Sequence, residues 1–295
     1  MVGYGIVSNG VHVLVVGELA TKVMGYEEGK VGEIIQIFKN TAYVRTLYDD
    51  LVCITSNKIR GPMNMNVEDI EFSGINLHDP VYKEGDVLRI HNSILSAKNA
   101  LVYRARRQFI ASEGLQERVI SAADAVATLG IKGSILDSES YFFNTFSQSI
   151  GRIARSSAKE DSFELQKGMR SLIGLGNGAT PSGDDFLAGF LFCLRTIAGE
   201  KSIRDLTFKI NNETSWYSRK FIEYAQDGFV IEPVENFASI LFSASKEGMS
   251  ESIHNLLTIG HSSGIDAALG VMFATTFGKE SEYCEVLLEK FGFKN

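Results

Sequence analysis

Proline and cysteine are scarce in this sequence, with four prolines and three cysteines among 295 residues. The cysteines, Cys53, Cys193 and Cys284, lie far apart and have no metal-ligand spacing. A sparse and odd cysteine content argues against a disulfide scaffold and is typical of a reducing compartment. The N-terminus lacks a basic segment followed by an apolar core, so the sequence predicts no signal peptide and a cytoplasmic location.

An excess of basic charge is also missing, because 29 basic residues face 36 acidic ones and the formal net charge is -7. Phosphate contacts require a basic face, so this balance argues against a nucleic-acid partner. The longest apolar run, residues 186–199, is too short for a membrane span and contains Arg195. It predicts a buried helix and no membrane partner.

The first hundred residues have the composition of β structure. Short runs rich in Val, Ile, Thr and Tyr are separated by turn residues such as Asn9-Gly10 and Glu84-Gly85-Asp86. Several short strands with regular turns are typical of a small barrel or sandwich. The predicted strands cover residues 11–19, 31–38, 41–48, 51–56 and 86–91.

Helical spacing of apolar residues replaces this pattern from about residue 93. The predicted helices cover residues 93–110, 116–130, 140–157, 214–228, 234–248 and 249–260. The sequence therefore predicts an α+β protein of two domains. The first, residues 1–95, is a small β barrel or sandwich, and the second, residues 96–295, is mainly α-helical and carries the glycine-rich motifs.

A glycine-rich stretch, LIGLGNGATPSGDDFLAGF over residues 172–190, is the most unusual passage of the chain. Part of it returns near the C-terminus, where residues 260–270 read GHSSGIDAALG. The two passages share the pattern S-G-x-D-x-x-x-G. Serine is a common helix N-cap, and the helix dipole stabilises a carboxylate in the first turn. The pattern therefore predicts two helices that begin alike and bring their N-termini into a common pocket.

The repeated serines, Ser182 and Ser263, are the predicted N-caps of these helices. Asp185 and Asp266 lie three residues further on, where a side chain can complete a capping box. In this alignment Asp185 and Gly189 of the first copy correspond to Asp266 and Gly270 of the second. The shared residues are explained by capping and close helix packing.

Asp184 has no counterpart of this kind, because the second copy has an isoleucine there. It is a candidate catalytic acid or base, as is His261, which directly precedes the second serine turn. A loop histidine with a backbone hydrogen bond is the alternative for His261. Three hydroxyls are expected either to face the same cavity or to begin a helix capped by Thr214: Thr214, Ser215 and Ser218.

A glycine-rich loop before a helix N-terminus is a common anion-binding site, because free N–H groups and the helix dipole favour negative charge. The chain has no Walker A loop and no dinucleotide fingerprint. A capped helix after a flexible loop is the alternative interpretation. The candidate substrate-binding residues are Gly176, Asn177, Gly178, Thr180, Ser182, Gly183, Ser262, Ser263 and Gly264.

The acidic residues of the two copies repel a bare anion unless they cap helices or bind a cation. Asp185 and Asp266 are therefore candidates for a structural role or, with Asp184 and His261, for a divalent-metal site. Their spacing specifies no particular metal. The cofactor is left open between none and a divalent metal.

The glycine-rich stretch closely resembles the signature of a bacterial family of uncharacterised proteins, approximately G-L-G-x-G-L-T-P-S-G-D-D-x-L-x-G. Residues 260–270 look like the second signature of that family, G-H-T/S-S-G-x-D-x-L-x-G. Residues 214–228 resemble the helix between the two signatures. The resemblance covers about residues 90–278 and the β region only loosely, and Asn177 and Ala179 depart from the first signature.

The family includes AllH, a subunit of oxamate carbamoyltransferase, which works with FdrA-like and AllG subunits in anaerobic allantoin degradation. The resemblance implies a subunit of a carbamoyl-transfer enzyme in purine and allantoin nitrogen metabolism. It also implies partner subunits of FdrA-like and AllG-like type and a small anionic substrate, namely oxalurate, phosphate or carbamoyl phosphate. It assigns no catalytic residue. Two alternatives stay open, a metal-dependent hydrolase using clustered Asp and His and a non-catalytic assembly subunit.

Overall fold

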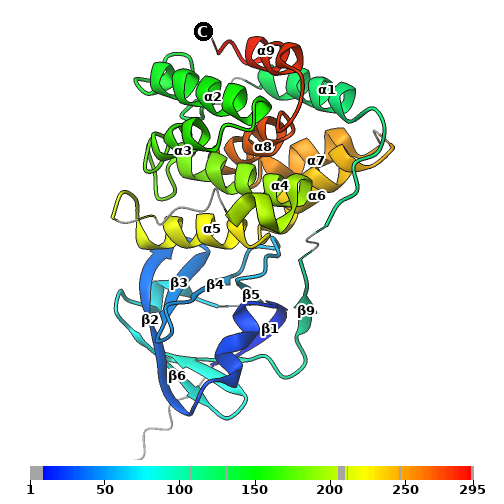
Figure 1. Ribbon diagram of the computed structural model, residues 1–295. Coiled ribbons are helices and arrows are strands. Elements are labelled where there is room, and N and C mark those ends of the chain that lie inside the picture. The colour runs from blue at the N-terminus through cyan, green and yellow to red at the C-terminus, as the bar shows by residue number, and fades with distance from the viewer. Residues whose placement is uncertain are drawn as a thin grey trace, which may run out of the picture. The chain divides into compact units, whose positions relative to one another are not determined.

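A computed structural model describes residues 9–68, 70–105, 108–129, 132–204, 210, 212–245 and 247–293. The chain divides into two compact units, Met1–Ala105 and Arg106–Asn295, which Figure 1 shows as strands and helices respectively. Each unit encloses a hydrophobic core of its own. The predicted α+β class is confirmed. That the two units are independent domains stays a prediction.

The first unit is a β barrel. Its strands, among the described residues, are β1 (Asn9–Gly17), β2 (Gly29–Phe38), β3 (Thr41–Thr46), β4 (Leu51–Thr55), β5 (Asn64–Val67), β6 (Pro80–Glu84), β7 (Val87–Ile90), β8 (Ser93–Ser96) and β9 (Leu101–Tyr103). They pair in the order β5-β4-β3-β2-β6-β7-β8-β1-β9, and β1 also pairs with β5. That pairing closes β1 to β8 into a ring, while β9 extends the second half of β1.

Alternation of side chains explains why these segments form a barrel. In β3 the side chains of Ala42, Val44 and Thr46 are buried, whereas those of Tyr43 and Arg45 between them are not. This period of two directs one set of residues to the barrel interior. Closure then pairs strands that would otherwise expose unpaired N–H and C=O groups.

The prediction of a helix over residues 93–110 is wrong. The structure has β8 and β9 there, separated by a turn at residues 97–100. Pairing with β1 decides the conformation, since Leu95 lies opposite Val11 and Leu101 opposite Val15 in parallel registers. Local helical spacing cannot report such a distant partner. Residues 106 and 107 lie outside the described residues.

The second unit is helical. Its α-helices, among the described residues, are α1 (Leu115–Ala127), α2 (Phe143–Ala158), α3 (Ser162–Arg170), α4 (Ser182–Arg204), α5 (Trp216–Gln226), α6 (Glu232–Phe242), α7 (Met249–Leu256), α8 (Ser263–Ala274) and α9 (Ser281–Lys290). The sequence predicted α1, α2, α5, α6 and α7 as helices and α4 and α8 as the helices that follow the two glycine motifs. It did not predict α3 or α9.

Helices α4 and α8 lie side by side at the centre of the helical unit (Figure 1). Every residue of α8 from Gly264 to Ala274 is buried, and Phe186, Phe190 and Phe192 of α4 are completely buried. A helix that is apolar on all sides belongs in a protein interior. The predicted buried helix is thereby confirmed. Over the stretches of chain described here, every helix is either too short or too polar to cross a membrane.

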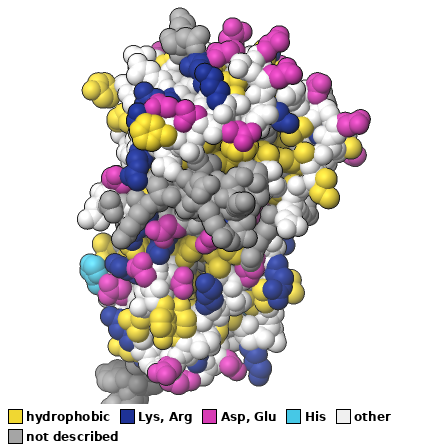
Figure 2. All heavy atoms as spheres, in the orientation of Figure 1, with side chains coloured by type: hydrophobic (Ala, Val, Ile, Leu, Met, Phe, Trp, Pro, Cys, Tyr) yellow, Lys and Arg dark blue, Asp and Glu magenta, His cyan; other side chains and the backbone are white. Residues whose placement is uncertain are grey.

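The surface mixes charges of both signs. Figure 2 shows Asp and Glu side chains interspersed with Lys and Arg on the face in view. This pattern agrees with the modest acidic excess of the sequence, a net charge of -7. The distinctive feature of the molecule lies in its interior, where α4 and α8 begin.

Candidate functional site

The two copies of the glycine motif pack against each other at equivalent positions. A Cβ atom at Gly189 of α4 would overlap the carbonyl oxygen of Ala267 in α8. A Cβ atom at Gly270 of α8 would overlap the carbonyl oxygen of Phe186 in α4. Gly189 aligns with Gly270, and Phe186 aligns with Ala267. The helices therefore contact each other reciprocally, as two copies related by a local two-fold do.

The repeat extends upstream of the pattern found in the sequence. Gly183 packs against the carbonyl of Leu172, and Gly264 packs against the carbonyl of Leu256 in the same way. In both copies a turn precedes the helix and folds back on its first residues. The first copy has the longer loop, with residues 177–181 where the second has only residues 261–262.

The prediction that Ser182 and Ser263 are N-caps is wrong by one position. Both serines are the first helical residues, and the N-cap of α8 is Ser262, whose side chain forms no capping hydrogen bond. The carbonyls of Pro181 and Ser262 accept from the N–H groups of Asp185 and Asp266 and close the first turns. The aspartates therefore do not complete a capping box.

Free backbone donors remain at both helix starts. In the part of the chain that is described, the N–H groups of Ser182 and Ser263 donate to no other residue. The same holds for the N–H groups of residues 176–180 in the loop before α4. Two helix N-termini with free N–H groups favour an anion, since each also carries the positive end of a helix dipole.

Hydroxyl groups link the two copies. The Thr180 hydroxyl lies 3.2 Å from the Ser263 hydroxyl and donates to Asp185 Oδ2 at 3.2 Å. Burial, and then the nearby charge of Asp266, raise the pKa of Asp185 well above its usual value, while the hydroxyls of Ser263 and Thr180 offset part of the shift. The site thus combines donors with carboxyl groups that resist ionisation.

Asp266 is the most buried acidic side chain of the site, with 0% exposure. Its Oδ1 accepts the Ile135 N–H at 2.8 Å, but among the described residues Oδ2 has no hydrogen-bond partner. Burial raises the pKa of Asp266 to about 7, partly offset by the Ile135 N–H and by the nearby Ser182 and Ser262 hydroxyls. At neutral pH this carboxyl is therefore poised between its charged and neutral forms.

Asp184 has different surroundings. It accepts hydrogen bonds from the Gly174 N–H at 2.8 Å, from the Ser218 hydroxyl at 2.6 Å and from the Thr214 hydroxyl. Burial raises its pKa, and these three bonds oppose the rise. Asp184 thereby fastens α4 to the preceding loop and to the start of α5. Of the three expected hydroxyls, those of Thr214 and Ser218 converge on Asp184. The N-cap of α5 is Ser215, not Thr214, and its hydroxyl accepts the Ser218 N–H.

The predicted site residues separate into a central and a peripheral set. Ser182, Gly183, Gly264 and Asp266 are buried, and Thr180, Asp185, Ser262 and Ser263 are partly buried around them. Asn177, Gly178 and His261 are exposed. No group of three or more His, Cys, Asp or Glu is arranged to hold a metal ion in the described ranges. The predicted roles of individual residues stay predictions.

The loop between α1 and α2 is a part of the site that sequence reasoning missed. Its Gly133 carbonyl accepts the Ser182 hydroxyl at 3.1 Å, and its Ile135 N–H binds Asp266. One loop therefore holds the starts of both α4 and α8. Nothing local in residues 132–137 reports this role, because both partners come from distant parts of the chain.

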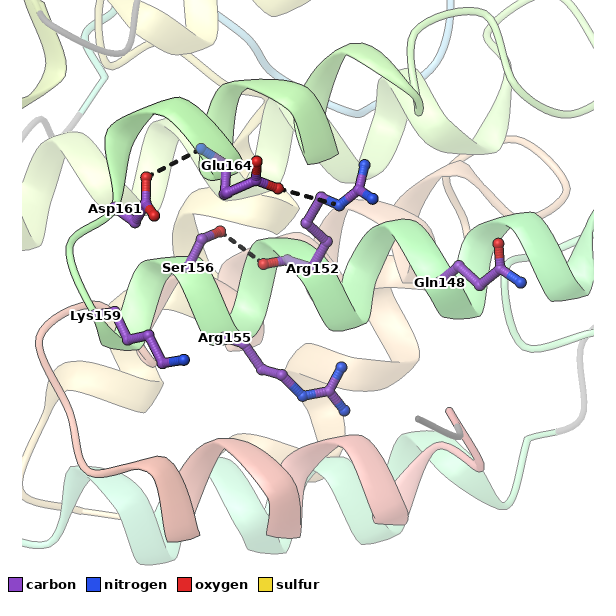
Figure 3. Close-up of a pocket in the computed structure, with 7 residues that line it drawn as sticks. All are labelled: Gln148, Arg152, Arg155, Ser156, Lys159, Asp161 and Glu164. Atoms are coloured by element: carbon purple, nitrogen blue, oxygen red, sulfur yellow. Dashed lines mark hydrogen bonds and ion pairs between the residues drawn. The ribbon is translucent and has the colours of Figure 1, made fainter.

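A separate groove lies along α2 and α3, where Figure 3 shows Arg152 directed to Glu164 and Arg155 directed towards α9. Arg155 forms a two-point ion pair with Glu285, with its shorter contact at 2.7 Å. Arg152 lies 3.6 Å from Glu164. Since these cations are already paired, the groove is a weaker candidate than the paired helix starts. Its lining residues are Gln148, Arg152, Arg155, Ser156, Lys159, Asp161 and Glu164.

The fold and the site define a class of protein: a β-barrel unit joined to a helical unit in which two glycine-motif helices begin side by side. A family model described as oxamate carbamoyltransferase subunit AllH matches residues 172–275, which contain both motifs. This match supports membership of the chain in the AllH family and confirms the resemblance of its signatures. Comparison with curated proteins gave no match, and comparison with solved structures gave none either.

Proposed function

We propose that this protein is a subunit of a carbamoyl-transfer enzyme of the oxamate carbamoyltransferase type and that it binds a small anionic substrate at the paired helix starts. The family match over residues 172–275 carries this proposal, because it spans both motifs. A subunit role implies protein partners. We further propose that these are FdrA-like and AllG-like subunits and that the pathway is the nitrogen metabolism of purines and allantoin.

The donors at the helix starts support an anionic substrate. The N–H groups of Ser182 and Ser263 are free among the described residues, and the hydroxyls of Thr180 and Ser263 lie 3.2 Å apart. Hydrogen bonds to a charged ligand contribute about 1.5–3 kcal/mol each. Oxalurate, phosphate and carbamoyl phosphate are all small anions that such donors suit.

The proposed reaction transfers the carbamoyl group of oxalurate to phosphate. A phosphate oxygen forms a bond to the carbamoyl carbon, and the bond from that carbon to the amide nitrogen breaks. The nitrogen takes up a proton, which gives oxamate and carbamoyl phosphate. Asp184 and His261 are the proposed acid–base residues. Asp184 is buried and accepts several hydrogen bonds.

Calorimetric titration of the full chain with oxalurate, phosphate and carbamoyl phosphate tests the proposal, both alone and with the partner subunits present. We expect binding of at least one of these ligands and phosphate-dependent release of oxamate by the assembled subunits. The absence of binding and of turnover under every condition would contradict it.

Two variants locate the binding. Thr180→Val and Ser263→Ala each remove one hydroxyl, and we expect about tenfold weaker binding, which corresponds to about 1.4 kcal/mol. Thr128→Val is the matched control, because Thr128 is exposed at the end of α1. Unchanged affinity in both site variants would place the anion elsewhere.

A further inference from the structure

Among the described residues, one oxygen of Asp266 has no hydrogen-bond partner, and an anionic ligand alone would not supply one. Oδ2 is buried and unpaired in the described part of the chain, and Oδ1 is already used by Ile135. An unpaired buried acceptor costs about 1–3 kcal/mol. Buried acceptors in native proteins are almost always satisfied, so this oxygen calls for a partner that a ligand supplies.

Among the residues that the structure describes, no basic side chain supplies that partner. Neither Asp185 nor Asp266 forms an ion pair with another described residue. The neighbouring Ser182 hydroxyl donates to the Gly133 carbonyl at 3.1 Å. The carboxyl groups of Asp185 and Asp266 therefore lie near each other at the two helix starts, with hydroxyl groups beside both.

A ligand that matches both sides must carry an anionic group and N–H donors together. A bare anion would be held by the helix N-termini but would leave Asp266 Oδ2 unpaired and face two carboxyl groups. The amide of a carbamoyl group carries two N–H donors and no charge. These two N–H groups can donate to the carboxyl groups of Asp185 and Asp266.

We propose that Asp185 and Asp266 form the acceptor pair for the N–H₂ group of a small anionic amide, and that this pair makes the site selective for carbamoyl compounds over other anions. The inference rests on the proposed function, which supplies the carbamoyl chemistry, and assigns to these two residues the recognition of the amide. Asp266 Oδ2 takes one N–H, and the partly exposed Asp185 carboxyl takes the other. The anionic end lies towards Ser182 and Ser263.

Oxamate and pyruvate provide a matched pair of probes. They have the same charge and nearly the same shape, but pyruvate carries a methyl group where oxamate carries its amide nitrogen. In calorimetric titrations of the full chain we expect oxamate to bind at least tenfold more tightly than pyruvate. Equal affinity for the two would overturn the proposal, even where oxalurate or phosphate still binds.

The variant Asp266→Asn tests the residue itself. The Ile135 N–H needs an oxygen acceptor, so the new amide keeps its oxygen there and directs its own N–H₂ to the place of Oδ2. We expect the preference for oxamate over pyruvate to fall to twofold or less. Asp124→Asn makes the same chemical change at an exposed site on α1 and should keep the full preference.

A preference that persists in a folded Asp266→Asn variant would also overturn the proposal. If that variant fails to fold, as judged by circular dichroism, Asp185→Asn replaces it, since Asp185 is partly exposed and should lose part of the preference. Failure of the proposed function has a different signature, namely that oxalurate, phosphate, carbamoyl phosphate and oxamate all fail to bind. The inference then fails with it.

Discussion

At the scale of single residues, three aspartates that look alike in the sequence have three different environments. Asp184 is held by three donors, and Asp185 is partly exposed beside two hydroxyls. Asp266 is fully buried, and one of its oxygens has no partner among the described residues. Burial raises the pKa of all three, and only Asp185 has the charge of Asp266 as a further major cause. Their roles follow from these partners and not from the motif.

Asp266 should make the stability of the protein depend on pH. Its pKa is about 7 in the folded chain, against about 4 in an unfolded chain. Between these values the folded state binds the extra proton, so its stability falls as pH rises from about 4 to about 7 and then levels off. Asp266→Asn removes this loss. We expect its free energy of unfolding, relative to the parent protein, to be roughly 3 kcal/mol higher at pH 8 than at pH 5.

Urea unfolding of both proteins at the two pH values measures this difference. The difference also includes a change at Asp185, because Asp266→Asn removes one of the causes that raise the pKa of Asp185. A pH-independent difference for Asp266→Asn would mean that the carboxyl titrates normally.

Asp184 should matter for stability whatever its part in chemistry. Asp184→Ala removes the acceptor for the Gly174 N–H and for the hydroxyls of Ser218 and Thr214. We expect a loss of about 3 kcal/mol in the free energy of unfolding, measured by urea titration. Asp227→Ala, at an exposed position after α5, should change it by less than about 0.5 kcal/mol. Comparable losses in the two variants would contradict this role.

At the scale of elements, the pair α4 and α8 organises the helical unit. The two helices approach closely because glycine stands at each point where one backbone meets the other. The same reciprocal contacts bring their first turns together, and the loop at Gly133 to Ile135 fixes both. Close packing and a shared site are therefore consequences of one repeated motif.

Gly189→Ala should force α4 and α8 apart. The added methyl group would overlap the Ala267 carbonyl, which belongs to a rigid backbone. Overpacking of this kind costs about 1–3 kcal/mol, and we expect the upper end here because backbone cannot rotate away. Thermal unfolding and the affinity for the anionic ligand should both be affected, since the helix starts move with the helices.

Gly25→Ala is the matched control for this change. A Cβ atom at Gly25 meets no atom within 4 Å, and its backbone has no positive φ. The substitution should be neutral or slightly stabilising. If the Gly189→Ala protein is as stable as this control, α4 and α8 leave room for a methyl group between Gly189 and the Ala267 carbonyl, and the prediction is wrong.

At the scale of the whole molecule, the two units have separate cores and should fold separately. Fragments 1–105 and 106–295 follow the division at Ala105 and Arg106. We expect each to unfold cooperatively on heating, with a β-type circular dichroism spectrum for the first and a helical one for the second. A fragment without a cooperative transition would mean that its core depends on the other unit.

Much of this architecture is encoded locally. The strands β1 to β4 and β7, most of the helices and the repeated glycine motif follow from the spacing of apolar residues and from turn chemistry. The residues of the motif also carry the resemblance to the AllH family, because the match of residues 172–275 covers both copies. The secondary structure of these segments can be predicted from the sequence, because interactions between residues close in the chain determine it.

The tertiary structure decided the rest, because it depends on partners far apart in the chain. Strands β8 and β9 form through pairing with β1, although their sequence has helical spacing. The first turns of α4 and α8 begin one residue earlier than capping rules predict, because the carbonyls of Pro181 and Ser262 close them. Asp266 is buried against the loop that carries Ile135, and in the described part of the chain one of its oxygens has no partner. This environment arises only when distant segments pack together.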